Sequence, residues 1–204
     1  MFYKYEDGHG LPHDPLKAIV APRPIGWISS RSKDGKLNLA PYSFFNMVST
    51  RPCLVMFSSE GRKDSVHFIE ETGVFAANLV SAELGVAMNA SSVDAPRGVS
   101  EFGYAGLTPV DCTLIEAPRV AEAHATLECV VTDIRSPRDR HGNPAAAIMV
   151  HGEVVGVHIS EAILTDGLVD IAKSRPLSRL GYMDFAAVSE TFRMVRPRWD
   201  DSAG

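Results

Sequence analysis

The chain has 204 residues, which fits one domain spanning 1–204, and its 45% hydrophobic and 22% charged residues are typical of a soluble globular protein. A net charge of −5 argues against a nucleic-acid partner, because nucleic-acid-binding proteins are usually basic. Cys53, Cys112 and Cys129 form no paired motif, so we expect free thiols. No apolar run approaches the ~20 residues of a membrane span, so we expect no membrane contact. The N-terminus lacks the apolar stretch of a signal peptide, so we expect a cytoplasmic protein.

Short apolar runs bounded by turn residues predict strands in the first part of the chain. They are PIGWIS at 24–29, LVMFS at 54–58 and VFAANLV at 74–80. Asp34 and Gly35 form a strong turn signal, so a hairpin turn is predicted over 31–36.

A long antiparallel hairpin is predicted over 127–159. Alternation over 127–134 puts Cys129 and Val131 on one face and Ile134 on the other. The second strand pattern, 145–159, is interrupted by Gly152 and Gly156, which predicts bulges or a barrel bend. The turn between the strands falls in DRHGNP at 139–144.

Helices are fewer and short. Apolar spacing predicts one over 65–72 with Gly73 as its C-terminal stop, and another over 81–90 with Ser81 as its N-cap. Residues 196–204 resemble a flexible tail. The pattern predicts a mainly β (α+β) fold, a β-barrel with a few short helices, with a two-sheet sandwich as the alternative.

A basic cluster opens the first predicted helix. Arg62, Lys63, Asp64 and Ser65 follow a strand that ends in the hydroxyls of Ser58 and Ser59. A helix start offers free N–H donors and partial positive charge, so this segment is a candidate phosphate site. The alternative is a solvated helix start that Asp64 or Ser65 caps.

Two further segments are candidates for a planar cofactor. In NLAPYSFFN, Pro41 stiffens the chain, Ala40 and Ser43 allow close backbone approach, and three aromatic residues offer stacking surface. The alternative there is a core strand with aromatic anchors. Ser29 and Ser30 could bond a ribityl chain or phosphate, or be solvated at a strand end.

Late in the chain, Arg179 could reach a phosphate and Tyr182 could cover a ring, although a solvated loop is the alternative. The histidines lack metal spacing, and no nucleophile motif or dinucleotide-binding glycine motif is present. We therefore predict no metal site and no catalytic acid, base or nucleophile.

Together these segments resemble the flavin reductase-like family, which includes flavoredoxins and the reductase components of two-component monooxygenases. The resemblance rests on APRPIGWISS, LNLAPYSFFNMVS, FSSEGRKDS, HGEVVGVHI and RPLSRLGYMDF and covers about residues 12–188. It implies an FMN-binding split β-barrel and a homodimer. By position, the FMN-binding residues would be Ser29, Ser30, Ala40, Pro41, Tyr42, Ser43, Phe44, Phe45, Asn46, Ser58, Arg62, Lys63, Asp64 and Ser65, with Arg179 and Tyr182 from the late motif.

The resemblance implies an NAD(P)H:flavin oxidoreductase in which the nicotinamide docks transiently, with a possible partner monooxygenase. The alternative is a non-catalytic FMN electron carrier or a flavin-storage protein. The sequence does not choose between NADH and NADPH.

Overall fold

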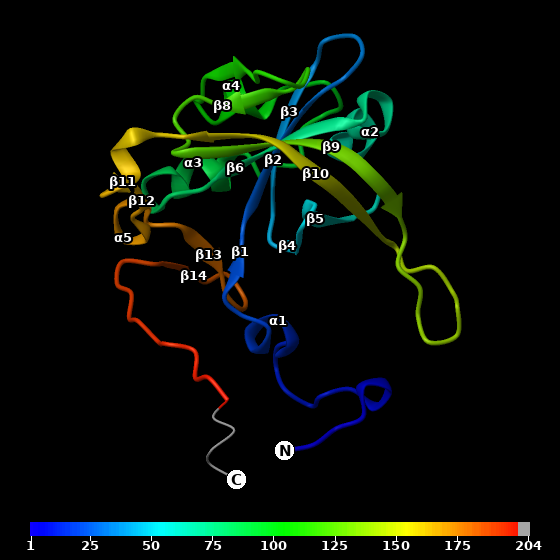
Figure 1. The fold of residues 1–204 in the computed structure, drawn as a ribbon. Helices are drawn as coiled ribbons and strands as arrows, with labels where there is room; N and C mark the ends of the chain where they lie inside the picture. The colour runs from blue at the N-terminus through cyan, green and yellow to red at the C-terminus, as the bar shows by residue number, and fades with distance from the viewer. Residues whose placement is uncertain (200–204) are drawn as a thin grey trace.

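The computed structural model describes residues 1–199 and is dominated by one curled antiparallel sheet (Figure 1). Its seven strands run in the order β3-β2-β6-β9-β10-β5-β4. Their bounds are β2 Gly26–Arg31, β3 Leu37–Tyr42, β4 Phe45–Thr50, β5 Cys53–Glu60, β6 Val74–Leu79, β9 Ala125–Arg135 and β10 Ala147–Ile159. The predicted mainly β fold is confirmed, and the sheet curls into a half-barrel as the barrel prediction requires.

Smaller elements surround this sheet. Three small sheets are formed by β1 (Arg23–Pro24), β13 (Leu177–Arg179) and β14 (Phe185–Ala187), by β7 (Pro109–Asp111) and β8 (Pro118–Val120), and by β11 (Leu164–Thr165) and β12 (Leu168–Val169). The helices are α1 Leu16–Ile19, α2 Asp64–Thr72, α3 Gly85–Ala90, α4 Glu101–Tyr104 and α5 Ile171–Ser174, with 3-10 turns at Tyr5–Asp7, Ala82–Leu84 and Glu161–Ile163. Within residues 1–199, no helix has the length and apolar character needed to cross a membrane.

The helix predicted at 65–72 is confirmed as α2. Gly73 ends it in the left-handed conformation (φ +73°) and donates its N–H to the Ile69 carbonyl. The helix predicted at 81–90 is instead a 3-10 turn followed by α3, and the Ser81 side chain caps neither. The backbone of Ser81 is extended and bridges to Pro176, so its side chain does not turn back onto the helix start.

The predicted hairpin over 127–159 is confirmed as β9 and β10, and its glycines mark the bulges. The β9–β10 register shifts between His151 and Gly152 and again between Val154 and Gly156. The first shift leaves Thr132 unpaired, and it corrects the predicted alternation: Ile134 packs on the same core as Val131.

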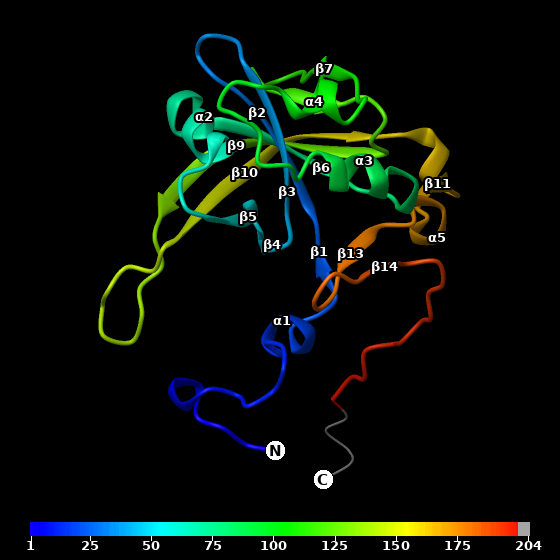
Figure 2. The ribbon, with the colours of Figure 1, turned by 180° about the vertical axis from the view of Figure 1, so that it is seen from behind.

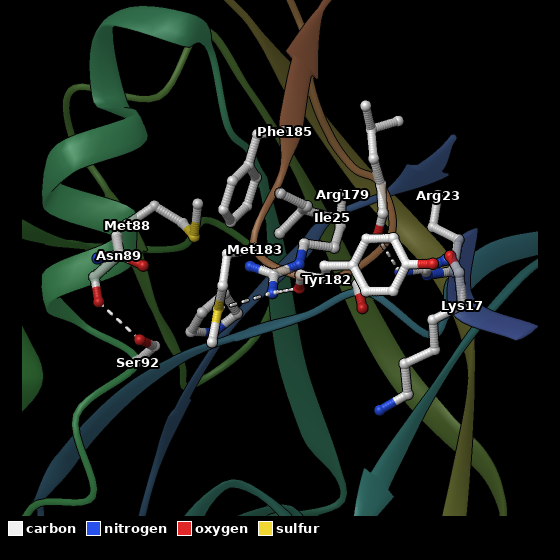
Figure 3. A pocket seen from close by; sticks show the side chains of 13 residues that line it. Lys17, Arg23, Ile25, Met88, Asn89, Ser92, Arg179, Tyr182, Met183 and Phe185 are labelled. Atoms are coloured by element: carbon white, nitrogen blue, oxygen red, sulfur yellow. Dashed lines mark hydrogen bonds between the residues drawn. The ribbon is translucent and has the colours of Figure 1, made fainter. Parts of the chain in front are cut away.

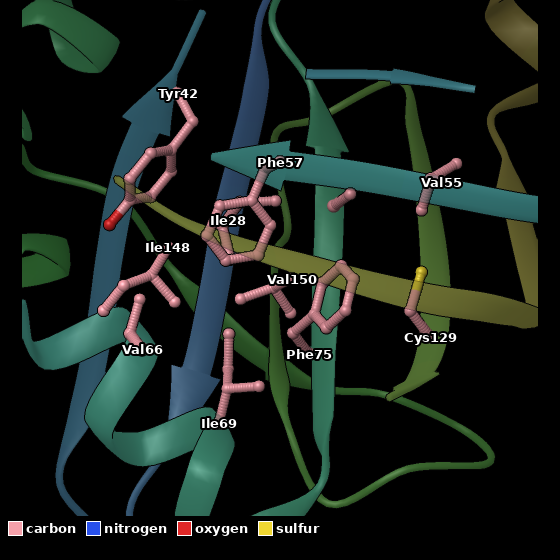
Figure 4. Packing of buried hydrophobic residues seen from close by; sticks show 11 residues of the cluster. Ile28, Tyr42, Val55, Phe57, Val66, Ile69, Phe75, Cys129, Ile148 and Val150 are labelled. Atoms are coloured by element: carbon pink, nitrogen blue, oxygen red, sulfur yellow. The ribbon is translucent and has the colours of Figure 1, made fainter. Parts of the chain in front are cut away.

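The core lies on both faces of the sheet. One cluster fills the inside of the curl, where the Phe57 ring contacts Tyr42 at a tilt and Phe75 edge to face, and Val66 and Ile69 of α2 close the side (Figure 4). The other cluster packs Trp27 and Leu39 under α3 and α4. Both clusters share strands β2 and β3, so these strands are fixed from both faces.

The C-terminal segment after β14 runs away from the sheet with no regular structure up to residue 199 (Figures 1 and 2). The flexible tail predicted for residues 196–204 stays a prediction, and residues 200–204 of it lie outside the described residues.

Candidate functional site

Three adjoining cavities surround Pro41, and we call them together the Pro41 groove. Their volumes are about 420, 180 and 180 Å³, and Pro41 lines all three. The largest lies between α3 and the β13–β14 turn (Figure 3), the second reaches the start of α2, and the third lies between β3 and β5. Eleven of the predicted site residues line the groove: Ala40, Pro41, Tyr42, Ser43, Phe44, Ser58, Lys63, Asp64, Ser65, Arg179 and Tyr182.

The segment 40–46 is mostly strand. β3 continues through Tyr42 and β4 begins at Phe45, so only Ser43 and Phe44 connect them. Tyr42 belongs to the core, with its ring centroid 4.7 Å from that of Phe57. The alternative of a core strand therefore holds for part of this segment, while Pro41, Ser43 and Phe44 face the groove.

Phe45 and Asn46 line a neighbouring cavity of about 410 Å³, which shares Arg23, Ser43, Phe44 and Ser58 with the groove. The Phe45 ring also covers Gly26, where an added Cβ would lie 2.4 Å from a ring carbon. The structure therefore places these two residues beside the Pro41 groove and not in its lining.

The start of α2 presents unused hydrogen-bond donors. Within the described residues the backbone N–H groups of Asp64, Ser65 and Val66 have no acceptor, and no side chain caps the helix. Lys63 is exposed and forms no ion pair with residues 1–199, whereas Arg62 is paired with Glu70 across the exposed face of α2. The predicted cation at this helix start is thus Lys63, and Arg62 points elsewhere.

Ser65 is held by a buried polar network. Its Oγ donates to Oδ1 of Asn38 at 2.5 Å, and the Asn38 amide donates to both oxygens of Glu101 at 3.2 Å. The Glu101 carboxylate also accepts the Leu39 N–H. Burial raises the pKa of Glu101 even though these bonds oppose it. Ser65 therefore has its hydroxyl proton committed to Asn38.

The Asp64 carboxylate and the Tyr42 hydroxyl also lie near the start of α2, where they would affect a bound ligand. The Asp64 carboxylate accepts from Arg97 and from the Gly98 N–H, which compensates its charge. The Tyr42 hydroxyl is buried with no partner of good geometry within residues 1–199, although Ser65 and Ser59 lie close; burial raises the pKa of Tyr42.

Ser29 and Ser30 are not in the groove lining. Ser29 is fully buried, donates to the Pro118 carbonyl and accepts from Asn78. Ser30 is also fully buried, and its hydroxyl has no partner among the described residues. The structure therefore separates both serines from the other predicted site residues.

Arg179 and Tyr182 line the opposite end of the groove. Arg179 donates to the Tyr182 carbonyl, and its guanidinium lies 4.5 Å from the centroid of the Phe185 ring. Sequence reasoning missed two cations there, Lys17 and Arg23. Arg23 stands in the APRPIGWISS motif, so its position was a signal that went unassigned.

Among the described residues no group of three or more His, Cys, Asp or Glu side chains is arranged to hold a metal ion. The groove instead combines exposed cations, free backbone donors and apolar walls. This donor set suits an anionic, planar organic molecule.

Comparison with known proteins identifies the relatives of this chain. An uncharacterized protein of Aquifex aeolicus is 38% identical over 184 residues, which cover 87% of this chain and 90% of the relative. Nitrilotriacetate monooxygenase component B from Bacillus cereus superposes with a TM-score of 0.84 at 30% identity, covering 95% of this chain and 98% of that chain.

A protein with a split barrel domain from Shewanella frigidimarina superposes with a TM-score of 0.83 at 19% identity, covering 97% and 100% of the two chains, so the split-barrel fold is confirmed. The family model described as "Flavin reductase like domain" matches residues 20–176, well over half of the chain. The chain therefore belongs to the flavin reductase-like family, and this membership supports a flavin-binding oxidoreductase.

Proposed function

We propose that the Pro41 groove binds FMN, with the phosphate at the start of α2. The observation that carries this proposal is the set of donors there: within residues 1–199, three backbone N–H groups have no acceptor and the neighbouring Lys63 ammonium forms no ion pair. A helix N-terminus of this kind favours a phosphate. The nearby carboxylate of Asp64 accepts the Gly98 N–H, and that of Glu101 accepts the Leu39 N–H. Neither carboxylate therefore occupies the donors at the start of α2.

The flat body of the cofactor would lie along Pro41, where β3 meets β4. Pro41 has no N–H and a fixed φ, so the wall is rigid, and Ala40 and Ser43 add little bulk. Tyr42, which itself lines the groove, packs against Phe57 and so anchors this wall to the core. Ser29, Ser30, Phe45 and Asn46 lie outside the lining and would act by supporting it.

We propose that the protein is an NAD(P)H-dependent flavin reductase. Bound FMN would supply the capacity to accept a hydride. The chain would contribute binding and orientation, because hydride transfer requires two rings held in near contact and no protein acid or base. A partner monooxygenase is consistent with the component B relative, and a homodimer is part of the same proposal.

The phosphate assignment is tested with Lys63→Ala. We change Lys63 alone, because replacing Ser65 would also remove its hydrogen bond to Asn38. One exposed charge-assisted contact contributes about 1.5 kcal/mol, so FMN binding should weaken about tenfold. Riboflavin has no phosphate, and its affinity should stay unchanged. Both affinities are measured by quenching of flavin fluorescence.

Lys33→Ala is the matched control, because Lys33 is exposed in the 31–36 turn and lines no part of the groove. It should leave both affinities unchanged. Equal losses for FMN and riboflavin in Lys63→Ala would refute the phosphate position.

The reductase role is tested by anaerobic mixing of the FMN-loaded protein with NADH or NADPH while the visible flavin absorbance is followed. Rapid bleaching with either nucleotide supports the reductase and identifies the donor. Flavin that dithionite reduces but neither nucleotide bleaches over many minutes would mean an electron carrier or storage protein instead.

A further inference from the structure

The inner face of the main sheet is left open at one end. Leu127 of β9 packs against the inner core and pairs with Val157 of β10, and Ala125 pairs in the same way with Ile159. Residues directly opposite each other in antiparallel strands share one face of the sheet. Val157 and Ile159 therefore continue the inner apolar face, yet they are 57% and 46% exposed. The curled sheet thus leaves part of its own apolar face in contact with solvent.

An apolar cavity of about 250 Å³ adjoins this open face. Leu127 of β9 lines one side of it and Leu177 of β13 the other, and its lining within residues 1–199 includes no charged side chain. We call this cavity, together with the exposed Val157 and Ile159, the barrel mouth. A cavity of about 150 Å³ already admits a benzene ring. The barrel mouth is therefore large enough to take an aromatic side chain.

A second unpartnered apolar surface begins at the rim of the barrel mouth. It is the C-terminal arm, residues 188–199. The Val188 N–H donates to the carbonyl of Pro176, which lines the cavity. Beyond Val188 the arm forms no hydrogen bond within residues 1–199 and runs away from the sheet (Figures 1 and 2). Phe192 and Trp199 on the arm are at least 86% exposed.

The direction and the charge of the arm favour a second copy of the chain as the partner of the barrel mouth. The arm points away from its own sheet, so it leaves its own mouth open, and two copies related by a two-fold axis can exchange arms in two identical contacts. The arm carries Arg193, Arg196 and Arg198 against Glu190, whereas the whole chain has a net charge of −5. A basic arm is attracted to the acidic body of another copy.

We propose that the C-terminal arm of a second copy covers the barrel mouth and places an aromatic side chain in its cavity. Each chain then completes the apolar core of its partner's barrel, and the joint burial removes two exposed apolar surfaces from water. The proposal rests on the homodimer of the proposed function but not on FMN binding. Among the residues lining the cavity of the barrel mouth, Ile25 is the one that also lines the Pro41 groove.

The test uses an arm variant and a mouth variant. The arm variant combines Phe192→Ser with Trp199→Ser. The mouth variant combines Val157→Thr with Ile159→Thr, because threonine keeps the β-branched shape that strands favour. Val110→Thr is the matched control, since Val110 is a 37% exposed valine in β7. Circular dichroism verifies that each variant is folded, and sedimentation velocity over a concentration series gives the dissociation constant of the dimer.

Wild type and Val110→Thr should form dimers of equal stability, and the arm and mouth variants should each weaken the dimer at least tenfold. The decisive measurement mixes the arm variant with the mouth variant. A mixed dimer retains one intact contact, between the arm of the mouth variant and the mouth of the arm variant. The mixture should therefore dimerise at concentrations at which neither variant does so alone.

Trp199 provides an independent readout, because the other tryptophan, Trp27, is fully buried. Acrylamide should quench Trp199 less in the wild-type dimer than in the mouth variant, and dilution of wild type to the monomer should abolish this protection. Protection that persists on dilution would mean that each arm covers its own mouth, and it would overturn the proposal. A mixture that dimerises no better than its components would also overturn it.

The outcomes separate this proposal from the proposed function. A wild-type protein that is monomeric throughout the series would refute the proposed homodimer and the arm exchange together, and an FMN titration of the same sample judges the cofactor separately. A dimer that the mouth variant leaves as stable as Val110→Thr does would refute only the arm exchange.

Discussion

Among single residues, Glu128 is a buried carboxylate that joins a loop to the main sheet. It is 1% exposed on β9, and its carboxylate accepts the N–H groups of Thr113 and Leu114, both at 2.7 Å, and contacts the His158 ring. Burial alone would raise the pKa of Glu128, but these bonds together hold it below its usual range. The carboxylate thus ties the loop after β7 to the sheet.

Glu128→Gln should lower the free energy of unfolding by about 2–3 kcal/mol at pH 7, because it removes charge-assisted bonds to buried N–H groups. The folded pKa is depressed, so the contribution of the carboxylate is complete above the unfolded value of about 4.3 and is lost as the pH falls through the folded pKa. The difference between wild type and variant should therefore shrink below about pH 4 in urea unfolding.

The matched control is Glu153→Gln, because Glu153 is exposed on β10 and makes no ion pair among the described residues. It should change stability by less than about 0.5 kcal/mol at any pH. A Glu128→Gln protein as stable as this control at pH 7 would contradict the structural role.

At the scale of elements, the bulge at Gly152 is a packing requirement of the sheet. A Cβ at this position would lie 2.6 Å and 2.7 Å from two ring carbons of Phe75 and 3.1 Å from Cβ of Cys129. Phe75 and Cys129 are both fully buried, so neither has space to move. The register shift and the missing side chain at Gly152 together allow the strand to approach Phe75 and Cys129 closely.

Gly152→Ala should lower the free energy of unfolding by about 1–3 kcal/mol through overpacking. Gly103→Ala in α4 is the control, because within residues 1–199 no atom outside the local helix backbone lies within 4 Å of its added Cβ, and alanine favours a helix. The two variants should shift the midpoint of thermal unfolding in opposite directions. A Gly152→Ala protein that unfolds like wild type would show that the Phe75 ring yields at little cost.

The elements that could be predicted from the sequence are those whose positions depend on residues close together in the chain. The Asp34-Gly35 turn, the Gly73 helix end and the two glycine bulges each depend on a few neighbouring residues. The face of Ile134 was predicted wrongly, because one unpaired residue in a long strand reverses the alternation after it. Nothing in a single sequence marks on which side of a bulge the extra residue falls.

The residues of the candidate site could be predicted only where several of them lie in one short sequence motif. Pro41 and Lys63 fall in motifs that could be read directly, and both line the groove. The Arg23 contact with the Leu180 carbonyl joins residues 157 positions apart, so no spacing rule could place the two together. Ser29 was predicted to contact the ligand because its hydroxyl is polar. That hydroxyl is instead bonded to Asn78 and Pro118, which lie on strands far from it in the sequence.

At the scale of the whole molecule, the groove forms where segments near both ends of the chain meet at strand β3. Its largest cavity is lined by residues of α1, near the N-terminus, of β3, in the first third of the chain, and of β13, near the C-terminus. α1 lies close to the β13–β14 turn in both ribbon views (Figures 1 and 2). The described structure also carries a C-terminal arm, residues 188–199, that runs away from the sheet. Phe192 and Trp199 on this arm are 86% and 89% exposed.

Apolar side chains gathered on an extended arm are a feature of surfaces that another chain covers. We therefore expect the proposed homodimer, the commonest closed assembly, to bury this arm. Light scattering at micromolar concentration should give about twice the 22.1 kDa of one chain. Phe192→Ser combined with Trp199→Ser should weaken the dimer by at least tenfold, because burial of a large apolar side chain contributes about 1.5–3 kcal/mol.

Val86→Ser is the control for that double change. Val86 is equally exposed, at 86%, but lies on α3 and not on the arm. It should leave the dimer intact, which separates a loss of arm contacts from a general loss of apolar surface. A monomeric wild-type protein at micromolar concentration would refute the dimer, and a dimer that survives the Phe192 and Trp199 changes would place its interface on another face of the molecule.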